Sequence, residues 1–166
     1  MKLIDALLAE FQYESQLTRN MLDRLPDGKF DYKPHEKSMT LGQLANHIGD
    51  IPNYVGGTLD VDELDFSNSD YKIPTNATKD ELVKAFDESV AKAIESFKRH
   101  DDDELMKEWT MKDGDKVYMK MPKAQVIRGF VLNHNVHHRG QLQVYLRMND
   151  IPLPSVYGPT ADEQAM

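Results

Sequence analysis

The sequence contains no cysteine. A chain without cysteine has no disulfide, no thiolate nucleophile and no cysteine-ligated metal. Any transition-metal site in this protein must therefore be built from histidine, carboxylate side chains and water. The six histidines are consequently the first residues to consider as metal ligands.

Long apolar runs and an excess of positive charge are also missing. No stretch approaches the roughly 20 apolar residues that a membrane-spanning helix needs. Lys and Arg number 20 against 28 Asp and Glu, which gives a formal net charge of −8. Because nucleic acids and anionic membrane surfaces are bound chiefly by Lys and Arg, we expect neither as a partner. The first residues acquire acids within one turn, unlike a signal peptide, which indicates a cytoplasmic protein.

Hydrophobic periodicity predicts helices along most of the chain. The 166 residues, 40% of them hydrophobic, fit a single domain spanning 1–166. Four segments repeat apolar residues at the helical period: 3–25, 40–57, 78–99 and 122–149. The second and third each begin with a capping box, in which Thr precedes Gln or Glu by three residues: Thr40 with Gln43, and Thr78 with Glu81. Four amphipathic helices with one long connection predict an all-α fold, a four-helix bundle.

The segments between these helices have other patterns. Residues 59–77 are rich in acids and predict a solvated loop. Residues 105–121 alternate apolar and polar residues about a turn at Asp113-Gly114 or Gly114-Asp115, which predicts a small β-hairpin insertion before the last helix. The tail after Ile151 is rich in proline and glycine and is expected to pack as an extended arm.

Three histidines are expected to face the interior of the bundle. His134 and His138 are four residues apart and therefore lie on one face of the last helix. His47 lies on the inner face of the second helix; taken alone, such a histidine is usually a core residue satisfied by backbone or hydroxyl partners, and less often a metal ligand. Two neighbouring buried imidazoles must share polar partners or repel when protonated, and a metal ion removes both problems. Three histidines with an open position form a known catalytic zinc arrangement.

Four further residues could support such a site. Glu14 and Thr18 interrupt the apolar stripe of the first helix, so that this face either meets solvent or lines a polar cavity. His137 lies beside the face shared by the two helix-four histidines, where we expect it to support the ligands. Gln141 follows His138 by three residues and could orient a ligand or bind substrate.

Other polar residues near the motif are expected to have no part in the site. Asn135 occupies the position where a zincin helix carries its glutamate general base, so protease chemistry is not expected. Arg139 is predicted to point outward. His35 and His100 are predicted to lie on the surface.

The sequence resembles the DinB/YfiT-like family over nearly its whole length. The similarity is carried by the runs LPDGKFDYKPHEKSMTLGQLANHIGDIP, HNVHHRGQLQVYLR and IPLPSVYGPTADE. The resemblance implies an antiparallel four-helix bundle, often a homodimer, in which three histidines hold a divalent metal, commonly nickel or zinc. By motif position these ligands are His47, His134 and His138.

The resemblance also implies a class of function. Better-understood relatives are metal-dependent S-transferases or isomerases that use low-molecular-weight thiols such as bacillithiol or mycothiol. We therefore expect a divalent-metal protein that joins such a thiol cosubstrate to a small-molecule substrate. Two alternatives remain: a metal-dependent hydrolase with Glu14 as general base, and a non-enzymatic stress-response metal-binding bundle. The family name refers to a DNA-damage-inducible gene and does not denote DNA binding.

Overall fold

The protein is mostly helical, as predicted, with a small sheet. The computed structural model describes residues 2–69 and 71–164. The longer helices are α1 (Leu3–Leu22), α2 (Leu41–Asp50), α4 (Lys79–Arg99) and α7 (His134–Arg147). The shorter ones are α3 (Asn53–Leu59), α5 (Asp102–Met106) and α6 (Lys123–Val126), and the strands are β1 (Glu63–Asp65), β2 (Glu108–Asp113) and β3 (Lys116–Pro122).

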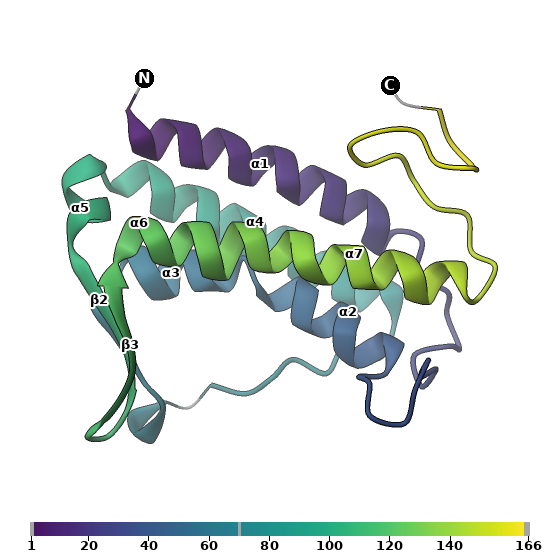
Figure 1. Ribbon diagram of the computed structural model, residues 1–166, viewed down its shortest axis with the longest axis horizontal. Coiled ribbons are helices and arrows are strands. Elements are labelled where there is room, and N and C mark those ends of the chain that lie inside the picture. Colours follow the sequence, from purple (N-terminus) through teal and green to yellow (C-terminus); the bar gives the residue numbers. More distant parts are fainter. Residues whose placement is uncertain (1, 70, 165–166) are drawn as a thin grey trace.

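The helices lie side by side along the long axis of the molecule (Figure 1). Helix α1 contacts α4 and α7, and α2 contacts the same two helices from the other side. Helix α3 continues the line of α2 and contacts α4. The sheet lies at one end of the helices, and the segment after α7 runs back over the other end (Figure 1).

Two apolar clusters fill the interior, one toward each end of the helices. The first includes Met21, Leu44, Phe86 and Leu146. The second includes Phe11, Val55, Phe97 and Val131. On α1 the residues between the two clusters are polar, and on α7 the histidine motif occupies the same level. The polar interruption seen in the sequence of the first helix is therefore one side of a polar layer between two apolar clusters.

The predicted helix starts are confirmed, and one predicted end is wrong. The Thr40 hydroxyl accepts from the Gln43 backbone N–H at 3.0 Å, while the Gln43 side chain accepts from the Thr40 backbone N–H at 2.9 Å. The capping box of Thr78 and Glu81 is also present. The second helix breaks around Pro52, which cannot donate a backbone hydrogen bond, but it resumes as α3 and passes through the Gly56-Gly57 pair to Leu59. Burial of Leu59, which is 1% exposed, favours this extra turn over an end at the glycines.

The last predicted helix is one rod with an irregular middle. Helix α6 is followed by a π-helical segment, η2 (Ile127–Asn133), and then by α7. A π-helical turn contains more residues than an α-helical one, so it changes which residues face inward. Phe130, an apolar residue of the predicted helix 122–149, is 38% exposed, whereas Leu132 is buried. Such insertions are frequent at functional sites, and this one ends directly before His134.

The sheet contains the predicted hairpin and one strand that was not predicted. Strands β2 and β3 are antiparallel, and Asp113 pairs with Lys116, so the turn is Gly114-Asp115. Gly114 has a φ of 57°, the positive value that a type II′ hairpin turn requires at its first position. The prediction of a loop throughout residues 59–77 is wrong at β1, which pairs parallel to β2. The pairing joins segments that are far apart in the sequence. A strand of three residues is also too short to show the alternation of apolar and polar residues that would predict it.

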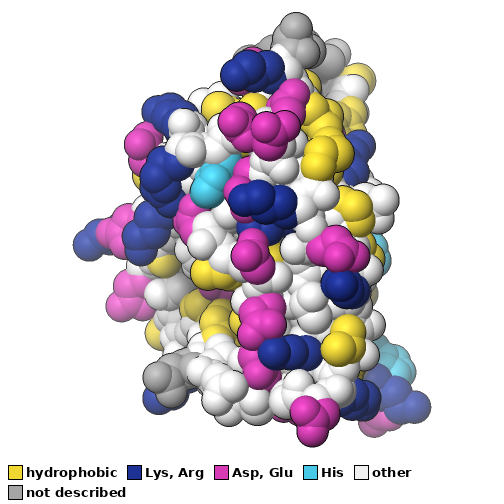
Figure 2. Space-filling model, turned by 90° about the vertical axis from the view of Figure 1, so that its left-hand side faces the viewer, with side chains coloured by type: hydrophobic (Ala, Val, Ile, Leu, Met, Phe, Trp, Pro, Cys, Tyr) yellow, Lys and Arg dark blue, Asp and Glu magenta, His cyan; other side chains and the backbone are white. Residues whose placement is uncertain are grey.

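In the part of the chain that the structure describes, the end of the molecule that carries the sheet has no separate basic patch (Figure 2). Figure 2 looks onto the end of the molecule that carries α5 and the sheet, where acidic and basic side chains are intermingled. Among the described residues, no helix is both long and apolar enough to cross a lipid bilayer.

Candidate metal centre

The structure brings three histidines from two helices to one point. His47 projects from α2, and His134 and His138 project from the first turns of α7. The Nε2 atom of His134 lies 3.1 Å from Nε2 of His47 and 2.9 Å from Nε2 of His138. One ring nitrogen from each residue lies within 4.8 Å of the other two.

The Nδ1 atoms of the two histidines on α7 are fixed by hydrogen bonds. Nδ1 of His134 donates to the Phe130 carbonyl at 3.2 Å, and Nδ1 of His138 donates to Oε1 of Gln141 at 2.7 Å. Because a carbonyl oxygen only accepts, each Nδ1 carries the proton, and the Nε2 of a neutral ring is left with a bare lone pair. Two such lone pairs face each other at 2.9 Å without a hydrogen bond between them. A cation between them would remove this repulsion.

Electrostatics keep the rings neutral. The pKa of His47 is lowered to about 4, chiefly by burial and further by the other two histidines, against a small opposing effect of Asp50. Burial also lowers the pKa of His134 and His138, although the Phe130 carbonyl and Gln141 partly offset this effect. Neutral imidazole is the form that binds metals.

The donor set fits a divalent ion with a preference for imidazole. A tetrahedral zinc with Zn–N bonds of about 2.0–2.1 Å holds its nitrogens about 3.3 Å apart. The 2.9 and 3.1 Å separations here are within a few tenths of an ångström of that value. Nickel also accepts imidazole ligands. His47 also borders an open groove of about 730 Å³ between α2 and the segment before α4. Phe30, Met39 and Asn76 line this groove as well.

The lowered pKa values predict that acid destabilises the metal-free protein. An exposed histidine has a pKa of 6.5, whereas that of folded His47 is about 4. Between these values the unfolded chain binds more protons than the folded one, so the free energy of unfolding falls as the pH is lowered from 6.5 to 4. Thermal unfolding midpoints of chelator-treated protein across this range measure the effect. His47→Gln should show a shallower pH dependence, and an equally steep one would contradict this origin.

Two of the expected supporting residues lie against His138. Gln141 is the hydrogen-bond partner of its Nδ1. His137 is exposed, and its ring centroid lies 4.8 Å from that of His138 in an edge-on arrangement. The structure thus places both beside one of the three clustered histidines.

Glu14 and Thr18 belong to α1 and contact a side of α7 that faces away from the histidines. There they meet Arg139, for which the prediction was wrong. Arg139 does not point outward: it is 2% exposed and pairs with Glu14, which is 6% exposed, at 2.7 Å. The Thr18 hydroxyl is within hydrogen-bond distance of Arg139 and of Asn135. The Tyr157 hydroxyl also donates to Glu14. The hydrogen bonds found for Glu14 therefore lead to Arg139 and Tyr157, and none of them reaches the histidines.

This arrangement has a physical reason that the sequence did not show. Arg139 follows Asn135 by four residues, so both lie on the face of α7 that packs against α1. A buried guanidinium needs a charged partner, and that partner is 125 residues away in the sequence.

Comparison with known proteins agrees with the fold. A family model described as the DinB family matches residues 1–165. The uncharacterized protein YrdA of Bacillus subtilis (strain 168) is 24% identical over 162 residues, which cover 98% of this chain and 92% of YrdA. A crystal structure of a DinB-like protein from Bacillus cereus ATCC 10987 is similar with a TM-score of 0.72 and 23% identity, covering 92% of this chain and 97% of that one. The DinB-like protein YjoA of Bacillus subtilis gives a TM-score of 0.70 at 20% identity, covering 97% and 99%.

Proposed function

The chain belongs to the DinB family, and we propose that it is a metal-dependent S-transferase that uses a low-molecular-weight thiol such as bacillithiol. In this proposal His47, His134 and His138 bind nickel or zinc through Nε2. The observation that carries it is the convergence of three imidazoles, two of which, His134 and His138, turn bare Nε2 atoms toward each other without a hydrogen bond between them. An antiparallel four-helix bundle, a homodimer and a cytoplasmic location belong to the same proposal.

The residues of the chain have separate tasks in this chemistry. When bound, a divalent ion with three neutral ligands keeps its full charge and favours a thiolate over a thiol at an open position. The Phe130 carbonyl and Gln141 hold two of the rings in orientation. Since the chain has no cysteine, the sulfur must come from a cosubstrate. That sulfur bonds to an electrophilic carbon of the substrate, the leaving group departs with its electron pair, and the thiol proton goes to solvent.

The same geometry weighs against the two alternatives. Hydrolysis would be helped by a general base near the ion, but the candidate, Glu14, is held in an ion pair with Arg139. A structural zinc site has four protein ligands. Within the described part of the chain, the cluster of candidate ligands comprises three histidines and no carboxylate.

The test is a conjugation assay on tag-free protein loaded with nickel or zinc. With bacillithiol and monochlorobimane, we expect the rate to exceed the uncatalysed background on the order of 100-fold or more, the effect of several kcal/mol of stabilisation at a metal site. A chelator should remove this rate, and added metal should restore it.

His35→Ala is the matched control, because it removes an exposed histidine outside the cluster and should leave the rate unchanged. A metallated protein that conjugates no faster than background would refute the S-transferase. Ester hydrolysis by the same preparation, without conjugation, would favour the hydrolase instead.

A further inference from the structure

A second, smaller pocket lies between the helices and the sheet. Its volume is about 130 Å³, and four aromatic side chains and one acid line it: Tyr54, Phe66, Tyr71, Trp109 and Asp50. The acid is the last residue of α2, and the rings come from α3, the 3-10 turn η1 (Phe66–Asn68), the following segment and β2. The described lining includes none of the three clustered histidines.

Asp50 is a buried acid that has no charged partner among the residues that the structure describes. The residue is only 4% exposed. Its carboxylate oxygens accept hydrogen bonds from the Asn53 amide at 2.9 Å and from the Tyr71 hydroxyl. Both donors are neutral. Of the ion pairs in the described residues, none joins Asp50 to a lysine or arginine. Since a buried charge is costly unless it is compensated, this carboxylate favours a cation in the pocket.

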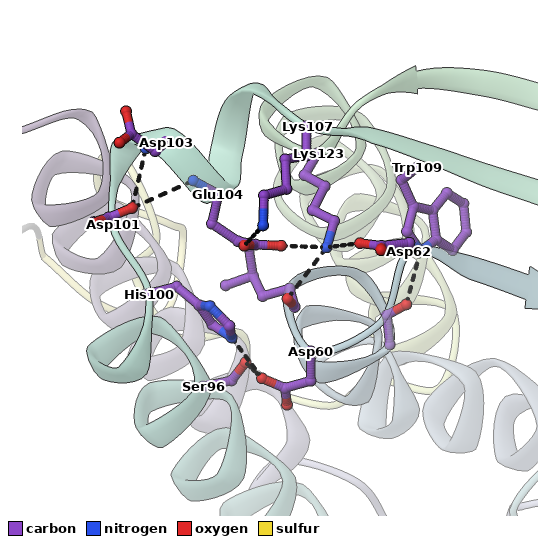
Figure 3. Close-up of polar contacts among 12 residues, drawn as sticks. Asp60, Asp62, Ser96, His100, Asp101, Asp103, Glu104, Lys107, Trp109 and Lys123 are labelled. Atoms are coloured by element: carbon purple, nitrogen blue, oxygen red, sulfur yellow. Dashed lines mark hydrogen bonds and ion pairs between the residues drawn. The ribbon is translucent and has the colours of Figure 1, made fainter.

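Three other acids at this end of the molecule, Asp60, Asp62 and Glu104, have charged partners within the chain; that of Asp60 is Arg99, at 2.8 Å. Lys123, which is fully buried, pairs with Glu104 at 2.5 Å and with Asp62 at 2.8 Å, as Figure 3 shows. His100 binds Asp60 at 2.9 Å in the same view and is half-buried, not fully on the surface as predicted. Among the described residues, Asp50 therefore differs from Asp60, Asp62 and Glu104 in having only neutral partners.

The rings around Asp50 are suited to hold a cation. Burial, reinforced by Asp50, raises the pKa of Tyr54 and of Tyr71, so both phenols stay protonated and neutral. Trp109 is 2% exposed, and its indole N–H donates to the Gly57 carbonyl at 3.0 Å, which fixes the ring (Figure 3). The faces of aromatic rings attract cations, tryptophan most strongly, and cages of such rings recognise alkylated ammonium groups.

We propose that this pocket binds the alkylated ammonium group of a small molecule, with Asp50 as the counter-charge and the four rings as a cage. Alkyl groups on the nitrogen bury well against aromatic walls. A fully alkylated nitrogen also has no N–H, so it needs no further acceptor in a lining that is mostly apolar. The site is separate from the metal centre, and the proposal stands whether or not the histidines bind metal.

The chain's single tryptophan gives a direct measurement of binding. We would titrate choline into chelator-treated and into metal-loaded protein and follow Trp109 fluorescence. The neutral isostere 3,3-dimethylbutan-1-ol has the same shape without the charge. We expect saturable quenching by choline in both preparations, and binding of the isostere weaker by about 10-fold or more, as for a desolvated cation–π contact.

Variants separate charge from shape. Asp50→Asn should weaken choline binding about 10-fold while leaving the neutral isostere unchanged. Asp115→Asn removes the same charge from the exposed hairpin turn and should change neither. Phe66→Leu removes a ring that is 46% exposed, so the fold should be retained while choline binding weakens.

Three results would overturn the proposal. They are the absence of saturable quenching by choline, equal affinity for choline and its neutral isostere, and unchanged choline binding in a folded Asp50→Asn protein. Should that variant fail to fold, the wild-type comparison of choline with its isostere and the Phe66→Leu variant still decide the question.

Discussion

Replacing His47 with alanine is expected to abolish tight binding of divalent metal. The substitution removes the one nitrogen of the cluster that comes from α2, and leaves only the pair on α7, whose Nε2 atoms are 2.9 Å apart. Loss of a residue that merely supports a ligand costs about 10–100-fold in metal affinity, so loss of a ligand should cost more. Elemental analysis of tag-free protein, with competition against a chromophoric chelator, measures this change.

Two control variants give the scale for His47→Ala. His35→Ala should keep wild-type metal content, whereas Gln141→Ala, which frees Nδ1 of His138, should fall within the 10–100-fold range for a supporting residue. His47→Ala itself should fold, because it relieves the crowding of three imidazoles without a cation. A folded His47→Ala protein with wild-type metal affinity would show that the metal binds elsewhere.

The placement of the three histidines could be predicted because it depends on helix faces alone. His134 and His138 keep their spacing of four in α7, and His47 follows the apolar face of α2. The capping boxes also follow from short-range hydrogen bonds, which explains why Thr40 and Thr78 marked the helix starts. Local chemistry was sufficient for these features.

The features that could not be predicted depend on contacts between distant segments. The π-helical segment before His134 changes the inward face of that rod without any glycine or proline signal at its start. Strand β1 exists because β2 offers it an edge. The sequence predicts that Arg139 points outward, and nothing in it marks Asp50 as buried. Burial of the first depends on Glu14 in α1, and the aromatic surroundings of the second come from four different elements.

Arg139→Leu is expected to be the most destabilising of the substitutions considered. The substitution removes the charged partner of Glu14, a buried residue that is 6% exposed. Breaking a buried ion pair in this way costs about 3–5 kcal/mol in the free energy of unfolding. For a domain of this size the thermal midpoint should fall by roughly 6–20 °C. Calorimetry or urea unfolding at pH 7 measures the loss.

Two further measurements identify the stranded charge as the cause. The double variant Glu14→Leu with Arg139→Leu should recover most of the lost stability, because neither charge then remains buried. The deficit of Arg139→Leu alone should also shrink as the pH is lowered toward 5, since a stranded carboxyl takes up a proton more readily in the folded state. If the double variant lost as much free energy of unfolding as the two single variants together, the two residues would not be coupled. Metal content should stay unchanged throughout, because the hydrogen bonds of Glu14 do not reach the histidines.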